Sequence, residues 1–174
     1  MTGRLRCDKH AGAADAIEAG GLAQLAVDLM AGRAELADVV GITDDELEAL
    51  YVFGHRYYRC GKYEHALSFF RFLCLHRHTD ARFWLGLAGA SQVLGRAEVA
   101  VRAYSLAGVL NSQDPQIPLR AAECFLKLKR PTAAIGAFGD VLARSAGKPE
   151  HATFARRARI MLDRLQARET FDNA

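Results

Sequence analysis

The feature that most constrains this chain is an internal repeat with a period of 34 residues. Three units follow one another without a gap, at 47–80, 81–114 and 115–148. Only small side chains let two helix backbones approach closely, and such residues recur at fixed places in every unit. The eighth position holds Gly54, Ala88 and Ala122, and the twentieth holds Ala66, Ala100 and Ala134. This spacing predicts two helices per unit that cross at the small residues.

Other positions support the same register. Gly61 and Gly95 fall between the two helices of a unit, where a residue free to adopt positive φ ends a helix. The third unit has Lys129 at that place, and its Pro118 and Pro131 fall within the first turn of a helix, where a missing N–H costs little. The twenty-fourth position carries a large side chain that is expected to fill the space between units, namely Phe70, Tyr104 and Phe138.

A period of 34 residues is the length of one tetratricopeptide repeat (TPR). The sequence therefore predicts an all-α fold, in which three tandem TPRs form a curved helical solenoid. The alternative is an unrelated helical bundle with ordinary 3.6-residue periodicity, which would not explain the constant spacing of the small residues.

The segments that flank the repeats predict an N-terminal helical arm at 1–42, the repeats at 43–148, and a capping helix and tail at 149–174. Upstream, Ala13 to Met30 is predicted to form a helix interrupted at Gly20-Gly21, and Thr43-Asp-Asp-Glu46 is a capping box that starts the first repeat helix. Downstream, an amphipathic helix runs from Pro149 to about Arg168. It can cover the last open face of the solenoid with Phe154, Ala158, Met161, Leu162 and Leu165.

Composition places the chain among globular proteins that need no disulfide or metal to fold. It has 174 residues, 51% of them hydrophobic, which suffices for one core. Its four cysteines are scattered without paired spacing, so a reducing cytosol is the expected compartment. No apolar segment follows the basic N-terminal residues, and no run approaches the roughly 20 apolar residues of a membrane span, so we expect neither a signal peptide nor insertion in a membrane.

The net charge of +3 is unevenly distributed along the chain. Residues 1–46 carry four basic and nine acidic side chains, a net charge of −5, and the remaining +8 lies in residues 47–174. An acidic arm could pack on the basic body of its own chain or of a second copy. Alternatively, both segments are solvated helix faces.

Side chains of the first helix in each unit are predicted to line the concave side. In stacked TPRs the second, fifth, ninth and twelfth positions point inward, which gives Glu48, Tyr51, His55, Tyr58, Arg82, Leu85, Gly89, Gln92, Gln116, Leu119, Glu123 and Leu126. Tyr51 and Tyr58 offer flat apolar area at a low entropy cost, which suits an extended peptide, or they only close the contact between helices. Gly86 and Gly89 each cost about 1 kcal/mol in a helix, which indicates packing or room for a partner.

Chemistry-bearing alternatives find little support. The pairs His55 with Cys60 and Cys74 with His76 lack a third group to orient them. The His76-Arg77-His78 run matches no metal-ligand spacing. The arginines of the last helix are more typical of a solvated face than of a nucleic-acid site. We therefore expect no enzyme, no metal, no cofactor and no nucleic-acid partner.

Residues 50–123 resemble the class II chaperones of type III secretion, the LcrH/SycD-like family. The resemblance is carried by Leu50-Tyr51, by Gly61-Lys62-Tyr63-Glu64-His65-Ala66, by Leu73-Cys74, by the run Asp80-Ala81-Arg82-Phe83-Trp84-Leu85-Gly86-Leu87 with Gly89, by Ala103-Tyr104-Ser105, and by Ala121-Ala122-Glu123-Cys124. These motifs are more specific than a general TPR match.

The resemblance implies a bacterial cytoplasmic chaperone that binds a hydrophobic secreted translocator before export. The client segment would lie extended in the groove, against Tyr51, His55, Tyr58, Leu85, Gly89 and Leu119. The resemblance also implies a homodimer through the N-terminal arm and, for some members, a transcription factor as partner. The alternative is a general TPR adaptor or transcriptional co-regulator, but a reader of charged tails needs a clamp of cations, and Arg82 is the one cation among the inward positions.

Overall fold

The computed structural model describes residues 24, 27–28, 31 and 34–172. Most of the helix predicted from Ala13 to Met30 lies outside the described residues. Within the described residues every secondary-structure element is helical, which confirms the predicted all-α class. Its elements are α3 (Leu36–Val40), α4 (Asp44–Arg59), α5 (Tyr63–His76), α6 (Ala81–Val93), α7 (Ala97–Leu110), α8 (Gln116–Lys127), α9 (Pro131–Ser145), a 3-10 turn (Pro149–His151) and α10 (Ala152–Asp172).

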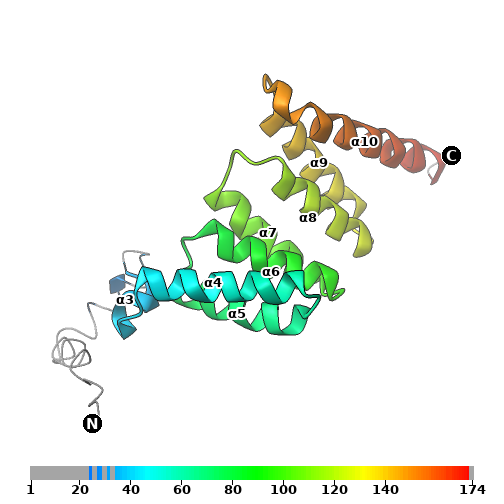
Figure 1. Ribbon diagram of the computed structural model, residues 1–174. Coiled ribbons are helices and arrows are strands. Elements are labelled where there is room, and N and C mark those ends of the chain that lie inside the picture. The colour runs from blue at the N-terminus through cyan, green and yellow to red at the C-terminus, as the bar shows by residue number, and fades with distance from the viewer. Residues whose placement is uncertain (1–23, 25–26, 29–30, 32–33, 173–174) are drawn as a thin grey trace, which may run out of the picture.

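The helices stack in chain order, each packed against the next from α4 to α10 (Figure 1). The pairs α4 with α5, α6 with α7, and α8 with α9 fall within the three predicted repeat units. The helix α10 packs on α9 as the first helix of a fourth unit would. The division into arm, repeats and cap stays a prediction.

Three equivalent turns join the two helices of each unit. Gly61 and Gly95 have φ values of 73° and 75°, and Lys129 adopts the same left-handed conformation with a φ of 56°. In each turn the next amide donates back across the helix end, from Lys62 to Tyr57 O, from Arg96 to Ser91 O and from Arg130 to Phe125 O, at 2.8–3.0 Å. The predicted turn position is confirmed, and in the third unit a lysine takes the strained conformation.

The predicted crossing points lie in the core. The alanines at the eighth and twentieth positions are fully buried, and so is Phe70. The Phe70 ring lies against Gly54 of α4 and Gly86 of α6, where an added Cβ at Gly86 would overlap the ring. The core forms two clusters, one from α3 to α8 and a second that joins α8, α9 and α10.

Both ends of the solenoid are anchored. Thr43 and Glu46 form the predicted capping box at the start of α4. At the same end, the Arg77 guanidinium pairs with Glu35 at 2.9 Å, with Asp38 at 3.0 Å and with Asp44 at 2.5 Å, which ties α3 and the start of α4 to the end of α5. Within the described residues, no helix has the combination of length and apolarity that crossing a membrane requires.

At the other end, α10 packs on the second core cluster with the predicted apolar stripe, including the fully buried Ala158. Its helix continues to Asp172, a few residues past the predicted end. Between these ends, Arg144 of α9 donates to three backbone carbonyls, those of Gly108, Asn111 and Asp114, each at 3.2 Å. This guanidinium closes the C-terminal end of α7 and the loop that follows it.

Candidate functional site

A pocket of about 320 Å³ opens between α4 and α6 on the side where the first helices face one another. Six of the predicted groove residues line it, together with one glycine and a core ring that the prediction did not place there. The lining is Tyr51, His55, Tyr58, Arg82, Leu85 and Gly89, with Gly86 and Phe70. We call this the apolar pocket, because rings, aliphatic groups and glycines make up most of its wall.

Tyr51 belongs to both the groove and the core. The centre of its ring lies 4.6 Å from the centre of the His55 ring and 5.6 Å from that of Phe83, and it makes an edge-to-face contact with Phe70. Burial raises the pKa of the Tyr51 hydroxyl and lowers the pKa of His55, so both groups favour the neutral form. Tyr51 therefore makes the helix contact that one interpretation expects, and it also lines the pocket, so its role toward a client stays a prediction.

Arg82 lies at the rim of the apolar pocket and is already neutralised. Its guanidinium pairs with Asp80 at 2.8 Å and with Glu48 at 3.0 Å, and it stacks over the Tyr51 ring at 4.9 Å from the ring centre. The hydrogen bond to Asp80 is the main reason that the pKa of Arg82 is raised. With two carboxylates beside it, Arg82 offers little charge to a partner.

The two glycines of α6 have different roles. Gly86 is filled by the Phe70 ring, so the expectation that it leaves room for a partner is wrong, and its reason is packing. At Gly89 the nearest atoms to an added Cβ belong to Tyr58, at 3.6 Å, which is ordinary contact distance. Gly89 thus forms part of the floor of the pocket.

The third unit does not continue this apolar surface. Leu119, predicted in the groove, is only 3% exposed and belongs to the second core cluster with Phe138 and Ala158, so it is not accessible to a partner. The cause is α10, which packs over the face that the first two units leave open. Leu126 also packs partly against this cluster.

A second pocket of about 180 Å³ lies between α6 and α8, and both polar and apolar side chains form its wall. It is lined by Leu85, Tyr104, Asp114, Gln116, Ile117 and Arg120, and we call it the mixed pocket. Leu85 borders both pockets. Of the predicted groove residues, Gln116 reaches this pocket, whereas Gln92 and Glu123 join a network next to it.

That network is organised by Glu123. Its carboxylate accepts from Gln92 Nε2 at 3.3 Å, from Arg120 Nη1 at 3.5 Å and from Arg157 Nη2 at 2.6 Å. Neither arginine was predicted in the groove, and Arg157 was among the arginines expected on a solvated face. The signal for Arg157 is the period itself, because a fourth unit counted from Pro149 has Arg157 at its ninth position, the inward position of His55, Gly89 and Glu123.

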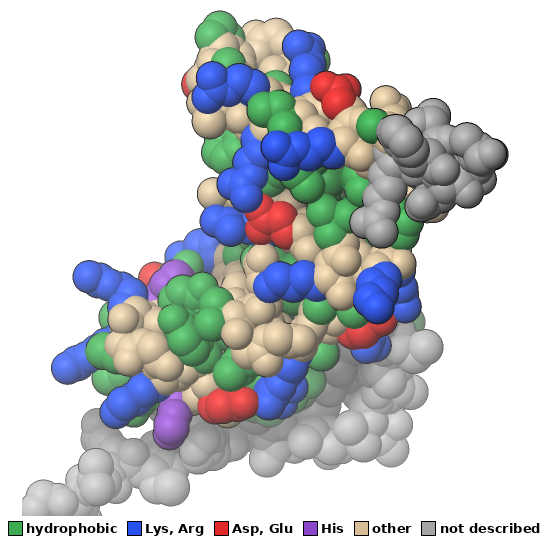
Figure 2. Space-filling model, turned by 90° about the vertical axis from the view of Figure 1, so that its right-hand side faces the viewer, with side chains coloured by type: hydrophobic (Ala, Val, Ile, Leu, Met, Phe, Trp, Pro, Cys, Tyr) green, Lys and Arg blue, Asp and Glu red, His purple; other side chains and the backbone are tan. Residues whose placement is uncertain are grey.

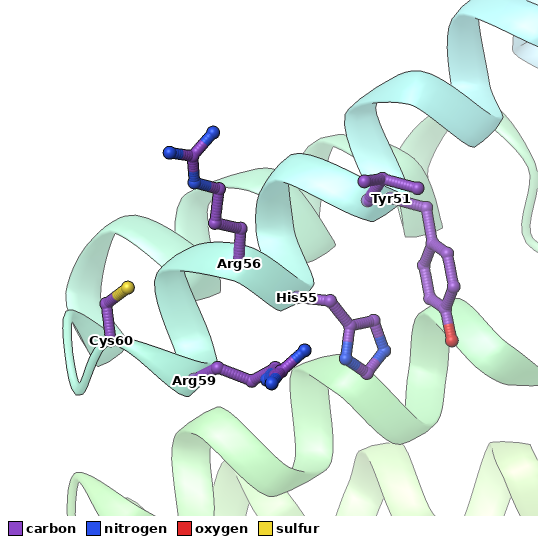
Figure 3. A pocket seen from close by; sticks show the side chains of 6 residues that line it. Tyr51, His55, Arg56, Arg59 and Cys60 are labelled. Carbon is purple, nitrogen blue, oxygen red and sulfur yellow. The ribbon is translucent and has the colours of Figure 1, made fainter.

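The visible face of the molecule mixes these chemistries. Figure 2 shows hydrophobic side chains beside basic ones, with an acidic patch among the basic groups where the molecule narrows. A further open hollow of about 860 Å³ runs along α4. Tyr51, His55 and Arg59 point to one side of this helix, whereas Arg56 and Cys60 point away from them (Figure 3).

The thiol and imidazole pairs do not form a reactive arrangement. Cys60 follows the end of α4, and its side chain points away from the His55 ring (Figure 3). Cys74 is buried, which raises the pKa of its thiol to about 12 and keeps it in the unreactive neutral form. His76 stacks on Phe72, and its Nδ1 lies 2.8 Å from Phe72 O, so its ring is engaged in a local contact within α5.

Known proteins resemble this chain in sequence and in fold, although no family model matches it. It is similar to low calcium response locus protein H of Yersinia pseudotuberculosis, with 33% identity over 153 residues that cover 86% of this chain and 90% of the relative.

Solved structures agree. The type III secretion chaperone SycD of Yersinia enterocolitica, in complex with a peptide of the translocator YopD, matches with a TM-score of 0.69 and 34% identity, over 74% of this chain and 98% of SycD. PcrH of Pseudomonas aeruginosa, in complex with the chaperone-binding region of PopD, matches with a TM-score of 0.69 and 38% identity, over 74% of this chain and 97% of PcrH. SycD has also been solved as an alternative dimer. By this similarity, which covers 86% of its length, the chain belongs to the family of class II type III secretion translocator chaperones.

Proposed function

We propose that this protein is a chaperone that holds an extended segment of a hydrophobic secreted translocator in its concave groove before export. The observation that carries the proposal is the apolar pocket between α4 and α6. Tyr58 and Leu85 line this pocket and are partly exposed, and Gly89 lies at its base. A client side chain can therefore enter the pocket without displacing the core. Occupation by the client would keep the translocator from aggregating and from meeting its partner too early in the bacterial cytoplasm.

The complexes of SycD with a YopD peptide and of PcrH with a PopD region support this proposal by analogy. The proposed contact residues are Tyr51, His55, Tyr58, Leu85 and Gly89. No step of this function needs a catalytic group or a cofactor, since binding and shielding of apolar surface suffice.

Burial of apolar side chains gains roughly 25 cal/mol per Å² before the cost of ordering the peptide. We therefore expect calorimetry with a synthetic peptide that carries spaced Leu, Val and Pro anchors to give a negative heat-capacity change. Affinity should change little between low and moderate salt. A steep fall of affinity with salt, together with binding that survives loss of the anchors, would replace this proposal with an electrostatic adaptor.

The double substitution Tyr51→Ala with Tyr58→Ala tests the pocket itself. We expect weaker peptide binding with a native far-UV circular dichroism spectrum. Some loss of stability should accompany it, since Tyr51 also contacts Phe70 and Phe83. Phe53→Ala is the matched control, because Phe53 is an exposed aromatic residue of the same helix that does not line the pocket. Equal loss of binding in both variants would contradict the assignment.

The proposal includes a homodimer through the N-terminal arm, for which the SycD dimer is the precedent. Deletion of residues 1–42 removes the arm together with the ion pairs from Glu35 and Asp38 to Arg77. The repeats should remain folded, and any dimer should shift toward monomer in sedimentation. An unchanged mass would exclude the arm from assembly. A transcription factor as partner stays a prediction.

A further inference from the structure

The end of the groove formed by α8 and α10 holds more hydrogen-bond donors than the described residues use. Arg120 has one described contact, at 3.5 Å from Glu123, and its side chain is 45% exposed. That distance is at the far limit of a hydrogen bond. A guanidinium carries five N–H donors, so within the described part of the chain most of the capacity of Arg120 is unused.

The position of Glu123 is set from the core. The buried Tyr104 hydroxyl donates to Gln92 Oε1 at 2.7 Å, and Gln92 Nε2 in turn donates to Glu123. Glu123, 22% exposed, then holds Arg157, whose side chain is 59% exposed. One carboxylate between two guanidinium groups leaves a net positive charge at this place.

The guanidinium of Arg82, at the other end of the groove, has the opposite surroundings. It lies between the carboxylates of Asp80 and Glu48. Asp114 also lines the mixed pocket, but its Oδ1 accepts the Gln116 amide at 2.8 Å. This contact lies at the N-terminus of α8, where the helix dipole offsets a negative charge. The unbalanced positive charge therefore remains with Arg120 and Arg157.

We infer that this end of the groove selects an acidic side chain of the bound segment, received by Arg120 with Arg157 beside it. The inference rests on the proposed function, because it requires a segment whose apolar side chain fills the apolar pocket. Leu85 lines both pockets, so an extended segment that leaves the first pocket reaches the second within a few residues. Charge-assisted hydrogen bonds from a guanidinium to a carboxylate then fix which residue enters.

A series of synthetic peptides tests this assignment by calorimetry. Each peptide carries the same Leu, Val and Pro anchors. A single glutamate is placed at each of the other positions in turn, and a peptide with glutamine at the same position is its matched control. At one spacing from the anchors, the glutamate peptide should bind about three- to fivefold more tightly than its match, as expected for a partly exposed pair. Arg120→Gln should abolish that preference.

Arg102→Gln is the control, because Arg102 is an exposed arginine of α7 whose described bond is to the Glu98 carbonyl of its own helix. It should keep the preference. Arg120→Glu should reverse the preference, so that a lysine peptide binds more tightly than the glutamine peptide at the same spacing, which also shows that the substituted protein is folded. If no spacing gives a preference for glutamate, or if the preference survives Arg120→Gln, the inference is overturned. The proposed function still stands in that case, provided that binding depends on the anchors. Binding that survives removal of the anchors overturns the proposed function instead.

Discussion

The fifth position of the repeat has different surroundings along the solenoid. Leu85 in the second unit is partly exposed and borders both pockets, whereas Leu119 in the third unit is buried under α10. The register of the repeat sets the direction of both side chains. The helix that follows decides whether that direction leads to a binding surface or to the core, so equivalent positions need not share a function.

The strongest test of this comparison is Leu119→Ala against Leu85→Ala. Leu119→Ala should lower the free energy of unfolding by about 2–5 kcal/mol, because it leaves a cavity beneath α10. Leu85→Ala should cost about 1 kcal/mol or less and should instead weaken peptide binding. Urea unfolding and calorimetry measure the two effects. Equal stability losses would show that the two positions are equivalent after all.

The two glycines of α6 sharpen the comparison within one helix. Gly86→Ala forces the Phe70 ring to move, and overpacking of a core costs about 1–3 kcal/mol. Gly89→Ala meets Tyr58 at ordinary contact distance, so the fold should be retained while the apolar pocket becomes smaller. Thermal melting of both variants provides the check. A lower melting temperature for Gly89→Ala than for Gly86→Ala would be inconsistent with the packing described.

A smaller effect is expected where α10 meets the groove. Arg157→Gln removes the ion pair with Glu123, and since Arg157 is largely exposed the loss should stay below about 1 kcal/mol. Arg159→Gln, an exposed arginine of the same helix, is the control and should be neutral. A loss of several kcal/mol in urea unfolding would mean that this pair, and not the apolar stripe, holds α10 in place.

The smallest expected effect is a pH dependence of stability that comes from His55 in the apolar pocket. Burial lowers the pKa of His55 below its ordinary value of 6.5, so between the two values the unfolded chain binds more protons than the folded one. The contribution of His55 is therefore present above pH 6.5 and is lost as pH falls through the lowered pKa. The urea midpoint should decrease slightly less from pH 7.5 to pH 5.5 for His55→Gln than for the unchanged protein. A larger fall in the variant would give the wrong sign.

Local rules account for what the sequence predicts well. The helix starts and turns follow from Thr43, Gly61 and Gly95, since caps and positive φ depend on residues close in the chain. The buried rings at the twenty-fourth position follow from the period. Even Lys129 is identified as a turn residue, because the repeat places it where two glycines stand in the other units.

Long-range contacts account for what it does not predict. The burial of Leu119 depends on how α10 packs, and the charge beside the mixed pocket depends on Arg120 meeting Glu123 beside Arg157. A side chain that binds backbone carbonyls 30 or more residues away, as Arg144 does, leaves no pattern in the sequence. Charge at the groove was predicted from single positions, yet it is the pairing of Arg82 and Arg120 with different neighbours that sets it.

Arg144 also affects which client segments the groove can recognise. By joining the end of α7, the loop before α8, and α9, it braces the second unit against the third. We expect this bracing to keep the distance from the apolar pocket to Arg120 constant when a segment enters. A rigid separation makes the interval between two side chains of the client part of what is recognised, so a segment with suitable residues at the wrong interval would bind at one pocket only.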